Sequence, residues 1–151
     1  MNNMIRKLTP QDKTDFLTLL DEFYHSPAVL HPVPAHFFER TYEQAVSDSP
    51  YVDVFLLEQE GKLAGYGQVS LTWSTEAGGM VVLLEELYLR PEFQGKGLGS
   101  AYFSFVSEYY AGRAARFRLE VEPDNEGARR LYGRLGYEEL PYVQMVRELG
   151  K

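Results

Sequence analysis

Residues 85–99 read EELYLRPEFQGKGLG, and this stretch decides the fold. The adjacent carboxylates Glu85 and Glu86 end an apolar run that begins at Met80. Glycines at 95, 97 and 99 follow in a loop that opens directly into an amphipathic segment. Glycine backbone at the start of a helix brings N–H groups close to an anion, and the helix dipole favours negative charge there. We therefore expect a strand that leads into an anion-binding loop, with acidic groups a few residues before it.

The segments on both sides of this stretch show strand or helix periodicity. Strands are expected over residues 3–8, 51–60, 62–74, 80–89, 116–122 and 141–147. Helices are expected to open at Thr9-Pro10, to span about 34–47, to run from the glycine-rich loop to Gly112, and to run from residues 123–125 to Gly136. Short turns join the strands between residues 51 and 89, which predicts antiparallel pairing there. The order β-α-α-β-β-β-α-β-α-β predicts a mixed α/β (α+β) fold in one domain, residues 1–151, with a twisted, mostly antiparallel sheet flanked by helices.

Composition excludes several classes of function. The chain has 151 residues, a net charge of −7 and no cysteine, which excludes disulfides, a thiolate zinc site and a cysteine nucleophile. The acidic balance argues against nucleic acid as a partner. The N-terminus lacks a signal-peptide core, and the longest clean apolar run, residues 80–84, is far too short for a membrane span. We expect a soluble, cytoplasmic protein without a membrane partner, and no metal, because the spacing of His25, His31 and His36 matches no common ligand pattern.

The spacing of the glycines distinguishes between kinds of anion-binding loop. A P-loop requires Gly-x4-Gly-Lys-Ser/Thr, and Lys96 stands at the wrong place for it. A dinucleotide-binding loop requires Gly-x-Gly-x-x-Gly, whereas this loop reads Gly-x-Gly-x-Gly. Glu120 lies about where such a fold carries its ribose-binding acid, but an antiparallel meander precedes the loop and a single βαβ unit follows it. A flexible turn is the plain alternative for a glycine-rich loop taken alone.

The loop fits a third pattern, Gln/Arg-x-x-Gly-x-Gly/Ala, in full. Through Gln94-Gly95-Lys96-Gly97-Leu98-Gly99 the chain resembles the GNAT superfamily of acyl-CoA-dependent N-acyltransferases. The preceding residues 87–93 and the downstream Asn125-x6-Tyr132, followed by Leu135-Gly136-Tyr137, look like the same family. The resemblance covers essentially the whole chain and is most specific over residues 81–137.

This resemblance implies a binding site for coenzyme A. The glycine-rich loop would hold the pyrophosphate, with side-chain donors from Gln94 and Lys96. The backbone of residues 87–89 would pair with the pantetheine arm, and Asn125 would hydrogen-bond that arm, unless it is a plain helix cap. The expected cofactor-binding residues are Leu87, Tyr88, Leu89, Gln94, Gly95, Lys96, Gly97, Leu98, Gly99, Ser100 and Asn125.

Tyr132 stands where the family carries the group that protonates the departing thiolate. A thiol pKa near 8.5 and a phenol pKa near 10 are close enough for useful proton transfer. The alternative role is structural, because Tyr132 shares one helix face with Ala128, Leu131 and Leu135.

Glu85 and Glu86 are informative without any family. Carboxylates at the end of an apolar run need a partner or a wet cleft, and strand alternation sends adjacent side chains to opposite faces. A lysine-like amine is neutral in roughly one molecule in a few thousand at pH 7, and attack on a thioester requires that neutral form. The resemblance places Glu85 where the family's polyamine acetyltransferases carry an acidic residue. We expect Glu85 as the base and Glu86 as an acceptor-binding group or alternate base; two solvated or salt-bridged carboxylates are the alternative.

The combined expectation is an acetyl-CoA-dependent N-acetyltransferase that transfers acetyl directly to a small-molecule amine, favoured to be a small cationic one. The competing hypothesis is a non-catalytic acyl-CoA-binding or sensor module, which would need the glycine-rich loop but neither Tyr132 nor Glu85. Residues 24–38, after the first helix, are expected to form a wall of the acceptor pocket or a packed surface loop. Dimers are common among the proteins that the chain resembles, so a homodimer is among the expected assemblies.

Overall fold

The strands pair in the order in which they follow along the chain. The computed structural model describes residues 2–150. Its sheet contains β1 (Asn3–Lys7), β2 (Val52–Gln59), β3 (Lys62–Ser74), β4 (Gly79–Leu89) and β5 (Ala114–Leu119), in the order β1-β2-β3-β4-β5. The pairings from β1 to β4 are antiparallel and the β4–β5 pairing is parallel, so the predicted mixed, mostly antiparallel sheet is confirmed.

A two-residue turn joins β2 to β3. Glu60 and Gly61 both have positive φ, at 53° and 74°. This is the conformation of a type I′ hairpin turn, whose twist matches that of the flanking strands. The hairpin predicted at residues 60–62 is therefore confirmed.

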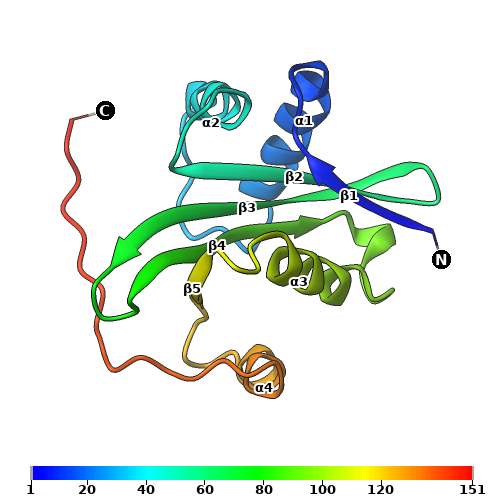
Figure 1. Cartoon of the computed structure of the whole chain (residues 1–151). Coiled ribbons are helices and arrows are strands. Elements are labelled where there is room, and N and C mark those ends of the chain that lie inside the picture. The colour runs from blue at the N-terminus through cyan, green and yellow to red at the C-terminus, as the bar shows by residue number, and fades with distance from the viewer. Residues whose placement is uncertain (1, 151) are drawn as a thin grey trace. The chain divides into compact units, whose positions relative to one another are not determined.

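Helices cover both faces of the sheet. A 3₁₀ turn at Pro10–Asp12 precedes α1 (Lys13–Tyr24), which lies with α2 (His36–Val46) on one face, while α3 (Leu98–Tyr109) lies on the other (Figure 1). Alternation along β2 divides the core accordingly. Leu56 packs in a cluster with α1 and α2, and Leu57 packs in a second cluster with α3.

An extra residue interrupts the alternation of β4 at the acidic pair. Leu84 pairs with Val69 and Glu86 pairs with Gln68, so Glu85 is an additional residue that forms a β-bulge. In a regular strand, residues three apart lie on opposite faces, but Leu84 and Leu87 both belong to the cluster on the α3 side. The prediction that Glu85 and Glu86 lie on opposite faces assumed a regular strand. The bulge interrupts that regular alternation at Glu85.

The chain divides into two compact units, Met1–Leu119 and Glu120–Lys151. The second unit contains α4 (Glu126–Arg134), close to the helix predicted there. The strand predicted over residues 141–147 was wrong, because residues 135–150 form neither helix nor strand. A strand needs a second strand to accept its backbone hydrogen bonds, and the described part of this unit offers none. The single domain over residues 1–151 stays a prediction.

Candidate active site

Glu86 is held by two tyrosines from different elements. Tyr66, in β3, donates its hydroxyl to Glu86 Oε1 at 2.5 Å. Tyr24, the last residue of α1, donates to Oε2 at 2.6 Å. Each carboxylate oxygen retains a second lone pair. The carboxylate is therefore fixed in orientation and still able to accept hydrogen bonds from a ligand.

Both phenols act as donors to Glu86. Burial, and next the negative charge of Glu86, raise the pKa of Tyr66 well above its usual value. Burial and Glu86 likewise raise the pKa of Tyr24, with a further contribution from Glu85. The two tyrosines therefore stay protonated at neutral pH. The negative charges of both Glu85 and Glu86 contribute to the raised pKa of Tyr24, and Glu85 does so from an exposed position.

A second set of contacts joins α1 to the end of β4. Arg90 donates from Nε and Nη2 to the two oxygens of Glu22, at 3.0 and 2.9 Å. Tyr88 donates its hydroxyl to Glu22 Oε1 at 3.0 Å. Hydrogen bonds from Arg90, and then from Tyr88, hold the pKa of Glu22 below its usual value. These contacts hold the C-terminal part of α1, with Tyr24, against β4.

The backbone of β4 is paired on one side only beyond the bulge. Pairing with β5 ends at Leu84 and Leu119, whereas pairing with β3 continues to Leu89. Between residues 85 and 89, the second edge of β4 has no partner strand within residues 2–150. An edge of this kind can pair with an amide-bearing ligand, as predicted for residues 87–89. Gln94 Nε2 donates to the Leu89 carbonyl at 3.0 Å, so that carbonyl already has one donor.

The glycine-rich loop leads directly into α3. Gly95 and Gly97 have φ values of 73° and 81°, and Gly97 is the N-cap residue of the helix. The first backbone bond of α3 runs from the Ala101 N–H to the Gly97 carbonyl at 3.0 Å, so the N–H groups of residues 98–100 have no acceptor within the helix. A Cβ at Gly95, Gly97 or Gly99 would meet nothing within 4 Å. The loop offers N–H donors without helical acceptors and open space beside its glycines, which fits an anionic ligand such as a pyrophosphate.

Sequence comparison identifies the family. The model of the acetyltransferase (GNAT) family matches residues 14–137. The chain belongs to the GNAT family. The match includes residues from both units, from α1 to residue 137, just after α4. It also includes every residue predicted for the site.

Individual relatives agree with this assignment. An uncharacterised N-acetyltransferase of Methanocaldococcus jannaschii is 29% identical over 93% of this chain, which spans 62% of that relative's length. The thialysine N-epsilon-acetyltransferase of Sus scrofa is 35% identical over 52% of this chain and 46% of its own. The solved structure of the aminoglycoside N-acetyltransferase AAC(6')-Iy with a CoA-linked bisubstrate analogue superposes with a TM-score of 0.79 at 16% identity, covering 99% of this chain and 100% of that one. The structural likeness supports the GNAT fold.

The remaining predicted residues of this GNAT chain lie in the second unit. Asn125 caps α4, and its Oδ1 accepts the Ala128 N–H at 3.2 Å. This cap is the structural role considered for Asn125, and it leaves the NH₂ group of the amide as a donor. Tyr132 is half-buried, and burial raises the pKa of its phenol above the usual value. Its ring packs edge-on against Tyr137, with 6.1 Å between the ring centroids.

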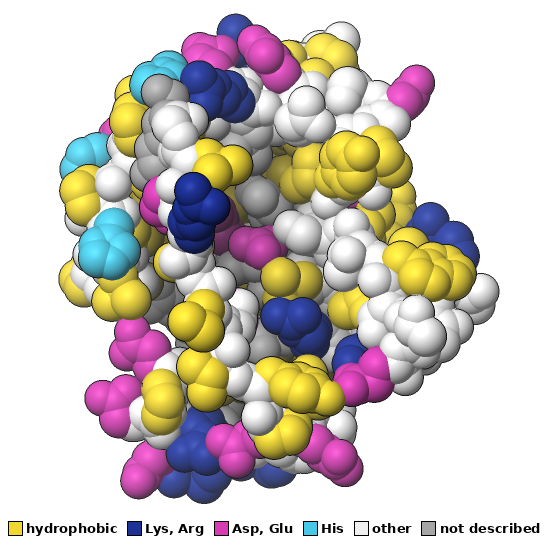
Figure 2. Space-filling model, turned by 90° about the vertical axis from the view of Figure 1, so that its left-hand side faces the viewer, with side chains coloured by type: hydrophobic (Ala, Val, Ile, Leu, Met, Phe, Trp, Pro, Cys, Tyr) yellow, Lys and Arg dark blue, Asp and Glu magenta, His cyan; other side chains and the backbone are white. Residues whose placement is uncertain are grey.

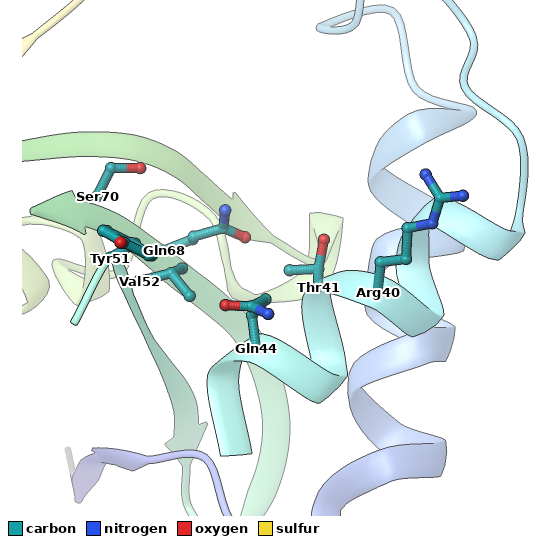
Figure 3. Close-up of a pocket in the computed structure, with 7 residues that line it drawn as sticks. All are labelled: Arg40, Thr41, Gln44, Tyr51, Val52, Gln68 and Ser70. Atoms are coloured by element: carbon teal, nitrogen blue, oxygen red, sulfur yellow. The ribbon is translucent and has the colours of Figure 1, made fainter. Parts of the chain in front are cut away.

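A surface pocket lies between α2 and the strands β2 and β3. Its volume is about 290 Å³. The residues that line it are Arg40, Thr41, Gln44, Tyr51, Val52, Gln68 and Ser70 (Figure 3). Sequence reasoning did not identify these residues, because they come from α2, β3 and the start of β2 with the preceding Tyr51, and form no motif. The predicted pocket wall at residues 24–38 contributes no residue to it.

The described part of this GNAT chain was also compared with the features of metal sites and of membrane-spanning helices. Within residues 2–150, no three His, Asp or Glu side chains gather as metal ligands would, and the histidines visible in Figure 2 lie apart from one another. No helix in that part of the chain combines the length and apolar character that a membrane crossing requires.

Proposed function

We propose that this protein is an acetyl-CoA-dependent N-acetyltransferase that transfers acetyl directly to the amine of a small molecule. The observation that carries the proposal is the placement of Glu86. Two tyrosines fix its carboxylate on β4, and the same strand runs on to the exposed glycine-rich loop of a GNAT chain. The acidic group on β4 suits an amine acceptor, and the anion-binding loop that follows the strand suits a pyrophosphate-bearing donor.

Acetyl-CoA supplies the thioester carbonyl that the amine attacks. The N–H groups of residues 98–100 and the Lys96 ammonium are assigned to its pyrophosphate. The unpaired edge of β4 at residues 87–89 is assigned to its pantetheine amides. The Asn125 NH₂ group is assigned to the same arm.

The two carboxylates have different roles in this proposal. Glu86, held by Tyr24 and Tyr66, binds the ammonium form of the acceptor through its remaining lone pairs. Glu85, whose side chain is exposed, accepts the proton directly or through water. Only the neutral amine attacks the thioester, so a base is needed more near pH 7, where that form is scarce, than at alkaline pH.

Tyr132 is the proposed general acid. The raised pKa of its phenol keeps it protonated up to alkaline pH, so it can donate to the departing thiolate. Tyrosine can serve in this step because its phenol is protonated at neutral pH and its pKa lies within reach of that of a thiol.

The acceptor is proposed to be a cationic small molecule. The named relatives include enzymes for thialysine and for aminoglycosides. Glu85 and Glu86 provide two negative charges for such a ligand, and the net charge of −7 favours its approach.

Release of free thiol from acetyl-CoA, measured with a panel of amines, tests the proposal. We expect thiol release to require an amine. Glu86→Gln should reduce it by raising the KM for the amine. Glu85→Gln should lower the rate mainly near neutral pH. Binding of acetyl-CoA without thiol release from any amine would instead indicate a non-catalytic binding module.

A further inference from the structure

The pocket beside α2 has the features of a binding site for one end of the acceptor. Its polar lining comes from α2 and β3, and Figure 3 shows Thr41 and Gln44 on the helix turned toward Gln68 on the strand. A volume of about 290 Å³ lies at the lower end of the range for small-molecule sites. The pocket is therefore matched to a group the size of one amino acid.

Gln68 connects this pocket to Glu86. The two residues are direct partners in the β3–β4 register, so their side chains leave the same face of the sheet as neighbours. Tyr66, two residues before Gln68 on β3, shares that face and donates to Glu86. A molecule whose amine lies at Glu86 would therefore pass Gln68 to reach the pocket.

The amide oxygen of Gln68 has an unmet need for a donor. Gln68 Oε1 is buried and accepts no hydrogen bond within residues 2–150. A buried acceptor without a donor destabilises the structure that contains it. A turn of the Gln68 amide that brought this oxygen to the pocket surface would let an N–H or O–H group of a ligand satisfy it.

Arg40 supplies the only charge among the residues that line the pocket. Its guanidinium lies over the Phe37 ring, with 5.2 Å from Cζ to the ring centroid. Within residues 2–150 no carboxylate forms an ion pair with it. A guanidinium is suited to a planar carboxylate, which it binds through two parallel hydrogen bonds.

We propose that the acceptor carries a carboxylate as well as the reacting amine, as a diamino acid does. The reacting amine lies at Glu86, a donor group of the ligand meets Gln68 Oε1, and the carboxylate lies at Arg40. The inference rests on the proposed acetyltransferase function and narrows its acceptor from any cationic amine to an amino-carboxylate.

Matched pairs of amines that differ only in the α-carboxylate test this inference. Lysine with cadaverine and ornithine with putrescine are suitable pairs, each compared by kcat/KM from thiol release. Within a pair that reacts, the amino acid should be favoured roughly 10–100-fold, the range expected for a hydrogen-bonded charged contact. Equal kcat/KM within every reacting pair, or a preference for the diamine, would overturn the inference and leave the proposed function standing. Absence of thiol release with every amine would overturn both.

Substitution of Arg40 tests whether this residue recognises the carboxylate of the acceptor. Arg40→Met should remove the preference for the carboxylate, mainly through KM, and leave kcat/KM for the diamine within about twofold. Arg113→Met is the matched control, because Arg113 also lies over aromatic rings, those of Tyr109 and Tyr110, and lines no part of the pocket. It should keep the full preference. Retention of the preference in Arg40→Met would overturn the assignment of the carboxylate to this pocket.

Discussion

Tyr66 donates its hydroxyl to Glu86 across the neighbouring strands β3 and β4, with 2.5 Å between the oxygens. The Tyr66 side chain is fully buried, and its ring packs edge-on against Phe16 of α1 at 5.4 Å between centroids. The orientation of the Glu86 carboxylate is therefore determined by a residue of the hydrophobic core. An acidic group held in this way is prepared for its ligand before the ligand arrives.

Tyr66→Phe removes this hydrogen bond and keeps the packed ring. We expect kcat/KM for the amine to fall roughly 10–100-fold, because a hydrogen bond to a charged group contributes about 1.5–3 kcal/mol. Affinity for coenzyme A, measured by calorimetry, should stay unchanged. Tyr102→Phe is the control: Tyr102 is equally buried, but its hydroxyl has no hydrogen-bond partner within residues 2–150. A loss of activity of the same size in both variants would show that Glu86 is not the cause.

Gly99→Glu tests the assignment of the loop to the donor. Gly99 lies in the first turn of α3 with ordinary φ, and an added Cβ would meet no atom within 4 Å. Helix propensity and the helix dipole both favour glutamate over glycine there, so stability should not fall. Coenzyme A affinity should nonetheless fall at least tenfold, because the added carboxylate would repel the pyrophosphate assigned to this space. Ser104→Glu, exposed on the same helix, should leave this affinity unchanged. Unchanged affinity in Gly99→Glu would contradict the loop assignment.

Tyr132→Phe should lower kcat roughly 100-fold or more while the affinity for coenzyme A changes little, since loss of a general acid typically costs that much. The wild-type enzyme should lose activity at alkaline pH as Tyr132 ionises. Because burial raises the pKa of this phenol, that loss should begin above the usual tyrosine value near 10. The alkaline limb should be absent from the residual activity of the variant. A limb that persists there would assign the titration to another group.

Asp12 should make stability depend on pH in the acid range. Arg6 donates to both of its oxygens at 2.8 and 2.9 Å, and chiefly for this reason the pKa of Asp12 falls from 3.8 to about 2. Because the pKa of Asp12 is lower in the folded state than in the unfolded state, its ionised carboxylate stabilises the fold. This stabilisation is complete above about pH 4, where the carboxyl is ionised in both states, and is lost as the pH falls to about 2. Asp12→Asn should therefore lower the free energy of unfolding by about 2 kcal/mol at pH 7.

Denaturant titration at several pH values measures this difference. The gap between wild type and Asp12→Asn should narrow steadily below pH 4 and close near pH 2. Asp48→Asn provides a comparison, because Asp48 is exposed after α2 and forms no ion pair within residues 2–150. A gap that stays constant down to pH 2 would exclude the ionised carboxylate as its source.

Local patterns were sufficient to predict most elements of the fold. The strand expected over residues 62–74 is β3 (Lys62–Ser74), and the loop pattern at residues 94–99 leads into α3 as expected. Periodicity and caps act within a few residues, so one segment carries enough information. The strand expected over residues 141–147 failed because strand formation depends on a second segment as well.

The surroundings of Glu86 could not be predicted in the same way. Tyr66 and Tyr24 precede it by 20 and 62 residues, and no local pattern connects them. The bulge at Glu85 appears only in the pairing of β4 with β3. The sequence therefore identified the acidic pair and left open which carboxylate the fold would hold.

The two packed clusters on opposite faces of the sheet have an evolutionary consequence. The cluster with α1 and α2 includes Tyr66, whereas the cluster with α3 includes Leu98 at the end of the glycine-rich loop. Side chains of α2 pack in the first cluster and are absent from the second. With the acceptor and donor sites assigned as proposed, descendants of such a chain can acquire a new acceptor by changing one face of the sheet while they inherit the other, and a lineage with a single donor can thereby diversify its acceptors.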